Sequence, residues 1–213
     1  MKYKRNNSRF SVKGRGNKMT MVKFINTYYN DMDKCTDFFF NVKWPGGYCC
    51  EKCQNKNFYY IKSRKLYRCT NCHHDESLLA HTCFEQCKLA LNVLLLGIYL
   101  IFTSRNGISS EELAEQLDVN YKTACLLNTK CRILMRESNC EKTLDSMFYE
   151  SDVAYIGAPS EGKRGLGSSK QPCLIVLSTD RKNQYPRYIK LKEIPVDSSE
   201  NIIPFFKKLC SNG

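Results

Sequence analysis

Four cysteines have the spacing of a metal centre. Two residues separate Cys50 from Cys53, two separate Cys69 from Cys72, and fifteen residues lie between the pairs. Each pair can close a tight backbone turn, or knuckle, that points two thiolates at one ion, and two knuckles complete a tetrahedron of sulfur ligands. The pattern predicts a structural zinc ion, because a shell of four thiolates leaves no open position for catalysis.

The chain has 13 cysteines, and the other nine lack such spacing. No apolar leader segment follows the charged N-terminus, so a disulfide framework is not expected. Cys49, His73 and His74 flank the knuckles and are weaker candidates for a ligand. The remaining cysteines are predicted to be small buried or half-buried side chains: Cys35, Cys83, Cys87, Cys125, Cys131, Cys140, Cys173 and Cys210.

The segment between the knuckles reads as a β-hairpin. Two aromatic-rich runs, residues 58–61 and 66–68, flank the basic turn Ser63-Arg64-Lys65. A hairpin held between two knuckles predicts a zinc ribbon, which about 30 residues of this composition could not maintain without the metal. Its tyrosines, Tyr59, Tyr60 and Tyr67, are expected to fill the small core, with stacking on RNA bases as the alternative.

Positive charge is concentrated in two segments. The formal net charge is +12, with seven cations and no acid in residues 1–20 and six cations against Glu51 in residues 49–72. Local excess of this kind is typical of segments that bind phosphate, so nucleic acid is the favoured partner. The first 22 residues are expected to form a basic, disordered arm, which a purely solvated tail would also explain.

A helical module is predicted after the ribbon. From Phe84 to Ser104 the apolar residues are nearly continuous around Leu94 and predict a buried helix. The most apolar run, 89–102, is too short to cross a bilayer. Ser109 or Ser110 can cap a short helix that ends near Asp118, and a longer basic helix follows from Tyr121 to about Arg136. Short helix, tight turn and basic helix are the layout of a helix-turn-helix, although a plain helical hairpin has the same pattern. The candidate DNA-binding residues are Asn120, Tyr121, Lys122 and Thr123 at the start of the second helix, with Lys130 and Arg132 further along.

After Cys140 the pattern changes to strands. Residues 146–156, 172–177 and 185–192 are predicted strands, and a helix is expected over residues 200–209. The fold class predicted for the whole chain is therefore α+β and multi-modular, with this last part in β-β-β-α order.

Several segments together resemble a known family. They are Trp44-Pro45-Gly46-Gly47-Tyr48 before the first knuckle, the ribbon, Gly107-Ile108-Ser109 with Tyr121-Lys122-Thr123-Ala124, Tyr155-Ile156-Gly157, and Gly162-Lys163-Arg164-Gly165. Their types and order are similar to the bacterial insertion-sequence transposases of the ISXO-like group over residues 25–213. That family joins a zinc ribbon, a helix-turn-helix and a ribonuclease H-like DDE domain.

The resemblance implies DNA cleavage and strand transfer by two magnesium ions held by carboxylates. The first acidic ligand of the family maps onto Asp152, and Glu150 matches a weaker acidic position. The sequence departs from the family pattern after Asp152, where Val153-Ala154 replaces Glu-Thr. The second and third acidic ligands are expected on elements beyond Gly213, and Asp180, Glu193, Asp197 and Glu200 are not expected to replace them. The prediction is a C-terminally truncated transposase that is inactive alone.

The predicted organisation is a basic arm (1–22), a helical lead-in (23–45), the zinc ribbon (46–80), the helix-turn-helix module (81–140) and an incomplete ribonuclease H-like domain (141–213). The expected cofactor is structural Zn²⁺, with Mg²⁺ only in a complete catalytic domain. The expected partners are double-stranded DNA of transposon terminal inverted repeats and either a second copy or a full-length transposase, with no membrane. The expected location is the bacterial cytoplasm, in association with the nucleoid. The alternative function is a non-enzymatic DNA-binding regulator.

Overall fold

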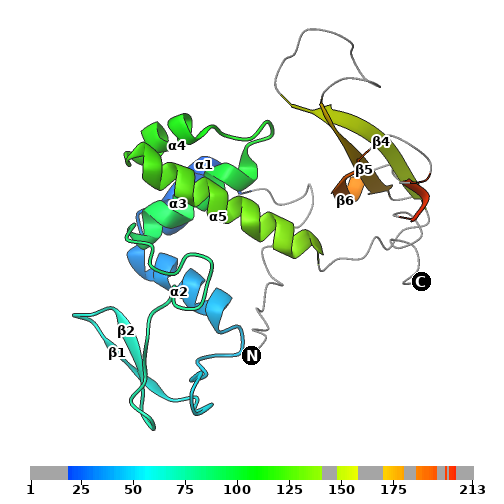
Figure 1. Ribbon diagram of the computed structural model, residues 1–213. Helices are drawn as coiled ribbons and strands as arrows, with labels where there is room; N and C mark the ends of the chain where they lie inside the picture. The colour runs from blue at the N-terminus through cyan, green and yellow to red at the C-terminus, as the bar shows by residue number, and fades with distance from the viewer. Residues whose placement is uncertain are drawn as a thin grey trace. The chain divides into compact units, whose positions relative to one another are not determined.

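The computed structural model describes residues 19–140, 148–157, 170–179, 186–195, 200 and 202–204. The chain divides into two compact units, Met1–Met135 and Arg136–Gly213. The first unit combines helices with a small three-stranded sheet, and the second contains another three-stranded sheet (Figure 1).

Short helices open the first unit. They are α1 (Met21–Phe24), the π-helical turn η1 (Ile25–Tyr29) and α2 (Met32–Lys43). The Thr20 side chain caps α1, and Asp31 caps α2 by accepting a hydrogen bond from the Lys34 N–H at 3.0 Å. Phe24 is buried and its ring stacks on Tyr99 at 4.3 Å between centroids. Residues 21 and 22, the last two of the predicted basic arm, lie in α1, and residues 1–18 lie outside the described part.

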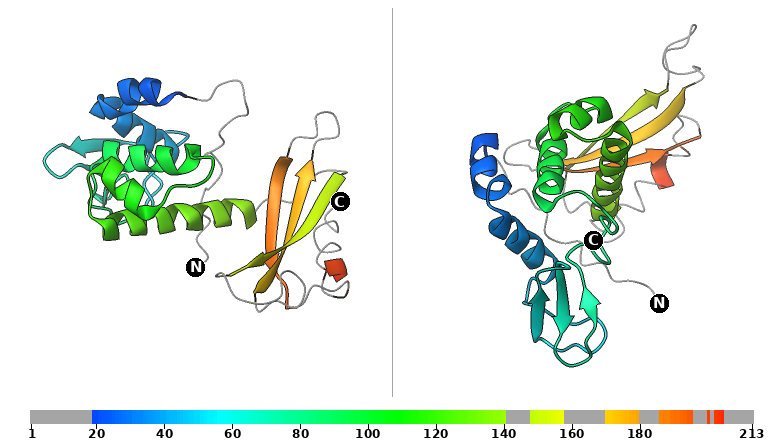
Figure 2. Two further views of the ribbon diagram at one scale, coloured as in Figure 1. Left: turned by 90° about the horizontal axis from the view of Figure 1, so that it is seen from above. Right: turned by 90° about the vertical axis from the view of Figure 1, so that its left-hand side faces the viewer.

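The sheet of the first unit has the strand order β1-β2-β3 and is antiparallel throughout. Strands β1 (Phe58–Ile61) and β2 (Leu66–Cys69) form the predicted hairpin, while the short β3 (Asp75–Glu76) was not predicted. Trp44, Tyr48 and Tyr67 are buried, and the Trp44 ring contacts the rings of both tyrosines, so aromatic residues supply the core that so small a sheet lacks. Figure 2 (right) shows α2 leading into this sheet.

The buried helix α3 (Leu91–Thr103) begins later than predicted. The predicted helix started at Phe84, but Gln86 adopts a left-handed backbone conformation (φ 61°) that interrupts the helix. Residues 84–86 lie in a turn, and residues 87–90 belong to no helix. Leu94, Leu95 and Ile98 are buried on α3. Within the described part of the chain, no helix is long and apolar enough to cross a membrane.

Helices α4 (Ser110–Leu117) and α5 (Tyr121–Cys140) have the order and the connecting turn that the sequence predicts. The Ser109 hydroxyl accepts a hydrogen bond from the Glu112 N–H at 3.0 Å and caps α4. Asp118 ends α4 in the left-handed conformation, with φ 50°. The Asn120 side chain accepts a hydrogen bond from the Lys122 N–H at 2.9 Å, which caps α5.

The second unit holds an antiparallel sheet in the order β4-β5-β6. Its strands are β4 (Phe148–Ile156), β5 (Gln171–Thr179) and β6 (Pro186–Glu193), in the segments where strands were predicted. Leu174, Val176 and Ile194 form a small buried core. Residues 200 and 202–204 are helical, whereas the rest of the predicted helix, Asp180 and Asp197 lie outside the described residues.

Candidate metal centre and nucleic-acid interface

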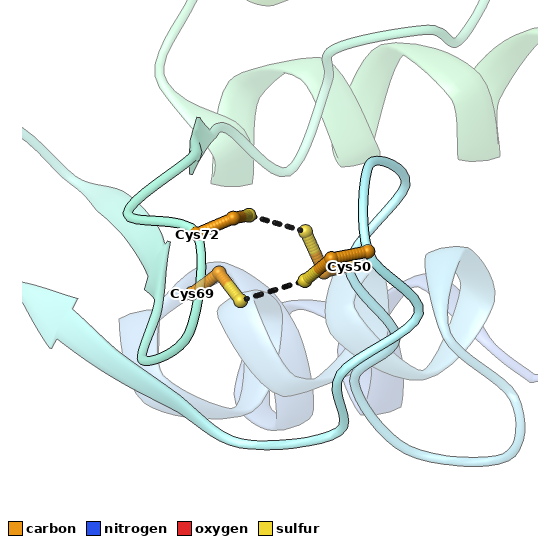
Figure 3. Close-up of side chains that lie close together, drawn as sticks. Cys50, Cys69 and Cys72 are labelled. Carbon is orange, nitrogen blue, oxygen red and sulfur yellow. Dashed lines mark hydrogen bonds between the residues drawn. The ribbon is translucent and has the colours of Figure 1, made fainter.

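The four predicted zinc ligands come together at the end of the ribbon. The Sγ atoms of Cys50 and Cys72 are 3.5 Å apart, as are those of Cys53 and Cys69. Figure 3 shows the side chains of Cys50, Cys69 and Cys72 close together. All four sulfur atoms lie within 4.8 Å of one another. In a regular zinc tetrathiolate with Zn–S bonds of about 2.3 Å, neighbouring sulfurs lie about 3.8 Å apart. The donor set therefore fits a structural zinc ion with little movement.

The two knuckles share one backbone design. Gln54 N–H donates to the Cys50 carbonyl at 2.9 Å, and His73 N–H donates to the Cys69 carbonyl at 3.2 Å. Gln54 and His73 also share the left-handed conformation, with φ of 60° and 56°. These equivalent turns direct both thiols of a pair toward one metal position, which is the geometry that the two-residue spacing predicts.

Hydrogen bonds favour the thiolate form at Cys69 and Cys53, whereas at Cys72 a backbone hydrogen bond is outweighed by desolvation and the neighbouring thiols, which raise the pKa to about 12. The Asn71 N–H donates to Cys69 Sγ at 3.4 Å, and the Asn55 side-chain amide does so at 3.5 Å. Although desolvation raises the pKa of Cys69, N–H donors that include those of Cys72 and Asn71 lower it to about 6. A backbone hydrogen bond from Asn55 lowers the pKa of Cys53. Lower pKa values favour the thiolate form that zinc requires.

The neighbouring candidates for a substitute ligand do not join this cluster. The Cys49 thiol lies 3.2 Å from the Gln54 side-chain oxygen, and His73 is exposed. His74 instead belongs to a second group, with Glu51 and Glu76, whose possible ligand atoms all lie within 4.8 Å of one another. Sequence spacing did not reveal this group.

The hairpin presents a basic and aromatic surface. Lys62, Arg64 and Lys65 are exposed in its turn. Tyr59 and Tyr60 are 45% and 41% exposed, whereas Tyr67 is buried, so only the last of the three serves the core as predicted.

The predicted DNA-binding residues of α5 differ in accessibility. Asn120, Tyr121, Lys122 and Arg132 are exposed, and Thr123 is half-buried. The Lys130 ammonium donates to the Glu85 carbonyl at 3.1 Å, so Lys130 supports the packing of the module. The predicted apolar stripe is buried at Ala124, Leu127 and Cys131 and half-buried at Leu134.

A buried polar residue, Asn128, was missed on the same helix. It donates to the Ile108 carbonyl at 3.2 Å, so it links α5 to the segment before α4. Asn128 lies on the same face of α5 as the predicted apolar stripe, and this position could have indicated a buried polar side chain.

Asp152, the predicted catalytic residue, is exposed on β4 opposite Ile175 of β5. Its carboxylate accepts a hydrogen bond from the Val153 N–H at 2.8 Å. Glu150, two residues earlier, lies on the same face of the strand because side chains alternate. Among the described residues, Asp152 belongs to no cluster that could hold a metal ion. The described residues therefore do not form a two-magnesium centre.

The comparison with protein families identifies the ribbon. The family described as "Transposase zinc-ribbon domain" matches residues 30–75, a range that contains all four clustered cysteines. No curated protein and no solved structure matches the chain. Residues 30–75 are therefore similar to a transposase zinc ribbon, and the four-cysteine cluster is consistent with structural Zn²⁺.

Proposed function

We propose that the chain is a transposase-related protein of an insertion sequence that binds the double-stranded DNA of transposon terminal inverted repeats. The observation that carries this proposal is the similarity of residues 30–75 to the transposase zinc-ribbon domain, together with the four-cysteine cluster inside that range.

The ribbon supplies the first DNA contact in this proposal. The exposed cations of the hairpin turn, Lys62, Arg64 and Lys65, can neutralise phosphates without reading the base sequence. The exposed rings of Tyr59 and Tyr60 beside them can pack against sugars or unpaired bases.

Helices α4 and α5 supply the second contact, as a helix-turn-helix. The exposed residues Asn120, Tyr121 and Lys122 stand at the N-terminal end of α5, the part of a recognition helix that meets base edges. Arg132 is exposed farther along α5 and is assigned to the phosphate backbone.

Fluorescence anisotropy with labelled duplexes tests this proposal on the zinc-loaded chain. The duplexes are the terminal repeat of the element that encodes the chain, a scrambled duplex of equal length, and the promoter next to the gene. Tight binding to the repeat with a steep salt dependence is expected, because log K falls by about 0.9 per neutralised phosphate per unit of log salt. Preference for the promoter would favour the regulator instead, and equal affinity for all three duplexes would contradict sequence-specific binding.

Two lysine variants separate base reading from general charge. Lys122→Ala is expected to reduce discrimination between the repeat and the scrambled duplex. Lys34→Ala, at an exposed lysine of α2 that pairs with Asp31, removes the same charge and is expected to leave that ratio unchanged. Equal effects of the two variants would argue against α5 as the recognition helix.

Asp152 is proposed as the first acidic ligand of a DDE-type catalytic domain. The 213-residue chain is expected to bind DNA without cutting it, and in the part of the chain that the structure describes Asp152 belongs to no group of three or more metal-ligand side chains. The test is incubation of the terminal-repeat duplex with the chain and Mg²⁺. Strand nicking that Asp152→Asn abolishes would refute the predicted lack of activity and support the assignment of Asp152.

A further inference from the structure

Glu76 of the ribbon contains a buried carboxylate oxygen without a partner. Its side chain is 4% exposed, and Lys43 Nζ lies 2.7 Å from Oε1. Oε2 is buried and has no hydrogen-bond partner. A buried charged oxygen without a partner is costly, so a structure that retains one requires an explanation.

Lys43 cannot supply the missing contact. Besides its contact with Glu76, its ammonium donates to the Ser77 carbonyl at 2.6 Å and to the Ala80 carbonyl at 3.0 Å. An ammonium has three hydrogens, so these three acceptors use all of them. The partner of Oε2 must come from another group.

Two further ligand-type side chains converge on Glu76. The ligand atoms that Glu51, His74 and Glu76 can offer all lie within 4.8 Å of one another. Glu51 lies between the cysteines of the first knuckle, His74 lies two residues after the second, and Glu76 lies on β3. The knuckle geometry therefore assembles this group as well as the four-cysteine cluster. His81 Nε2 lies 2.9 Å from Glu51 Oε2 and can hold that carboxylate in place.

We propose that Glu51, His74 and Glu76 form a second metal site that binds one divalent transition-metal ion. Two carboxylates and one imidazole are oxygen and nitrogen donors suited to borderline ions such as Zn²⁺ or Co²⁺, in contrast to the four thiolates next to them. Three protein ligands leave at least one position for water. The ion supplies the missing partner of Glu76 Oε2.

The local charge also favours a cation. Zinc bound by four thiolates carries a formal charge of 2−, and Glu51 and Glu76 add two more negative charges, against one positive charge from Lys43. A second divalent ion offsets most of the negative charge that Lys43 leaves uncompensated. Because this ion binds at the base of the ribbon, it would tie the first knuckle to β3.

Cobalt binding to the zinc-loaded full chain tests the proposal. The chain is loaded with only one equivalent of Zn²⁺, which the four thiolates take, because excess zinc would also occupy the second site. Zinc is held more tightly than cobalt by the same ligands, so Co²⁺ added to this protein leaves the four-cysteine zinc in place and reports on the remaining site. Equilibrium dialysis is expected to show one bound Co²⁺ per chain, with visible absorption but without the intense near-ultraviolet band of cobalt thiolates. Absence of bound cobalt would overturn the proposal and leave a buried water as the partner of Glu76. Cobalt bound with thiolate absorption would also overturn it.

Ligand variants locate the ion. Glu51→Gln and His74→Gln change side chains that are not buried, and each is expected to abolish the cobalt equivalent while the four-cysteine zinc stays bound. Glu76→Gln is expected to do the same, provided its circular dichroism matches that of the wild type. His73→Asn is the matched control, because His73 is an exposed neighbour outside the group and asparagine tolerates its positive φ. Retention of the cobalt equivalent in both Glu51→Gln and His74→Gln would overturn the assignment.

Discussion

Leu127 of α5 lies directly against the backbone of Gly97 on α3. A Cβ atom placed on Gly97 would be 2.6 Å from Leu127 Cδ2 and 2.9 Å from Leu117 Cδ1. Leu117 and Leu127 are buried, so both side chains would have to shift within a packed core to admit this atom. The glycine therefore allows α3 to approach α4 and α5 closely, and the module that presents Lys122 depends on this contact.

Gly97→Ala is expected to lower the free energy of unfolding of the first unit. Overpacking a closed core costs about 1–3 kcal/mol. Replacing glycine by alanine within a helix recovers about 1 kcal/mol, so a net loss is expected. Urea denaturation followed by circular dichroism measures the difference. The Leu127→Ala substitution should lower the free energy of unfolding less in the Gly97→Ala background than in the wild type, because the smaller side chain relieves the overpacking. Additive effects of the two substitutions would argue against the contact.

Asn128→Ala is expected to destabilise the same unit by about 1–3 kcal/mol. The substitution removes the hydrogen bond at 3.2 Å to the Ile108 carbonyl and leaves that acceptor without this donor. Thr129→Ala is the control, because Thr129 is exposed and its hydroxyl donates only to its own helix at Cys125. Equal midpoints of urea denaturation for the two variants would show that Asn128 does not have the structural role assigned to it.

The parts of the fold that sequence predicted depend on neighbours along the chain. The two-residue spacing within each cysteine pair predicts the knuckles. Two aromatic runs about a basic turn predict the hairpin, and Ser109 predicts the start of α4. Each of these signals lies within a few residues of the structure it specifies. The tertiary context did not need to be known.

The parts that sequence did not predict depend on contacts between distant segments. Strand β3 has two residues, which is too short for a periodic pattern, and forms because β2 offers an edge to Glu76. The grouping of Glu51 with His74 arises only after both knuckles have folded. The late start of α3 follows the left-handed backbone of Gln86, a conformation that the residue types from Phe84 onward do not reveal.

Cys69→Ser is expected to abolish zinc binding and unfold the ribbon while α3, α4 and α5 remain folded. Apparent zinc-binding energies in zinc-finger peptides are about 10–16 kcal/mol, far more than so small a sheet can replace. Zinc content is measured by mass spectrometry, and hydrogen exchange should show loss of protection in β1 and β2. Cys49→Ser, whose thiol lies outside the cluster, should retain zinc. A protected hairpin in the zinc-free variant would contradict the structural role of the ion.

Cys125 and Cys131 of α5 are expected to differ in alkylation rate. Hydrogen bonds from the side chains of Tyr121 and Ser110 lower the pKa of the half-buried Cys125 thiol. Burial raises the pKa of Cys131 to about 12, and Cys131 is fully buried. A lower pKa increases the thiolate fraction at a given pH, so iodoacetamide at pH 8 should label Cys125 first and Cys131 only after unfolding.

Tyr121→Phe tests the cause of this difference. Loss of the hydroxyl should raise the pKa of Cys125, so the pH midpoint of its labelling should move upward while Cys131 stays protected. Peptide mapping by mass spectrometry across a pH series measures both cysteines in the same sample. An unchanged midpoint would show that Tyr121 does not stabilise the thiolate. Because Tyr121 is also a proposed base-contacting residue, bound terminal-repeat DNA should slow the labelling of Cys125 in the wild type if α5 is the recognition helix.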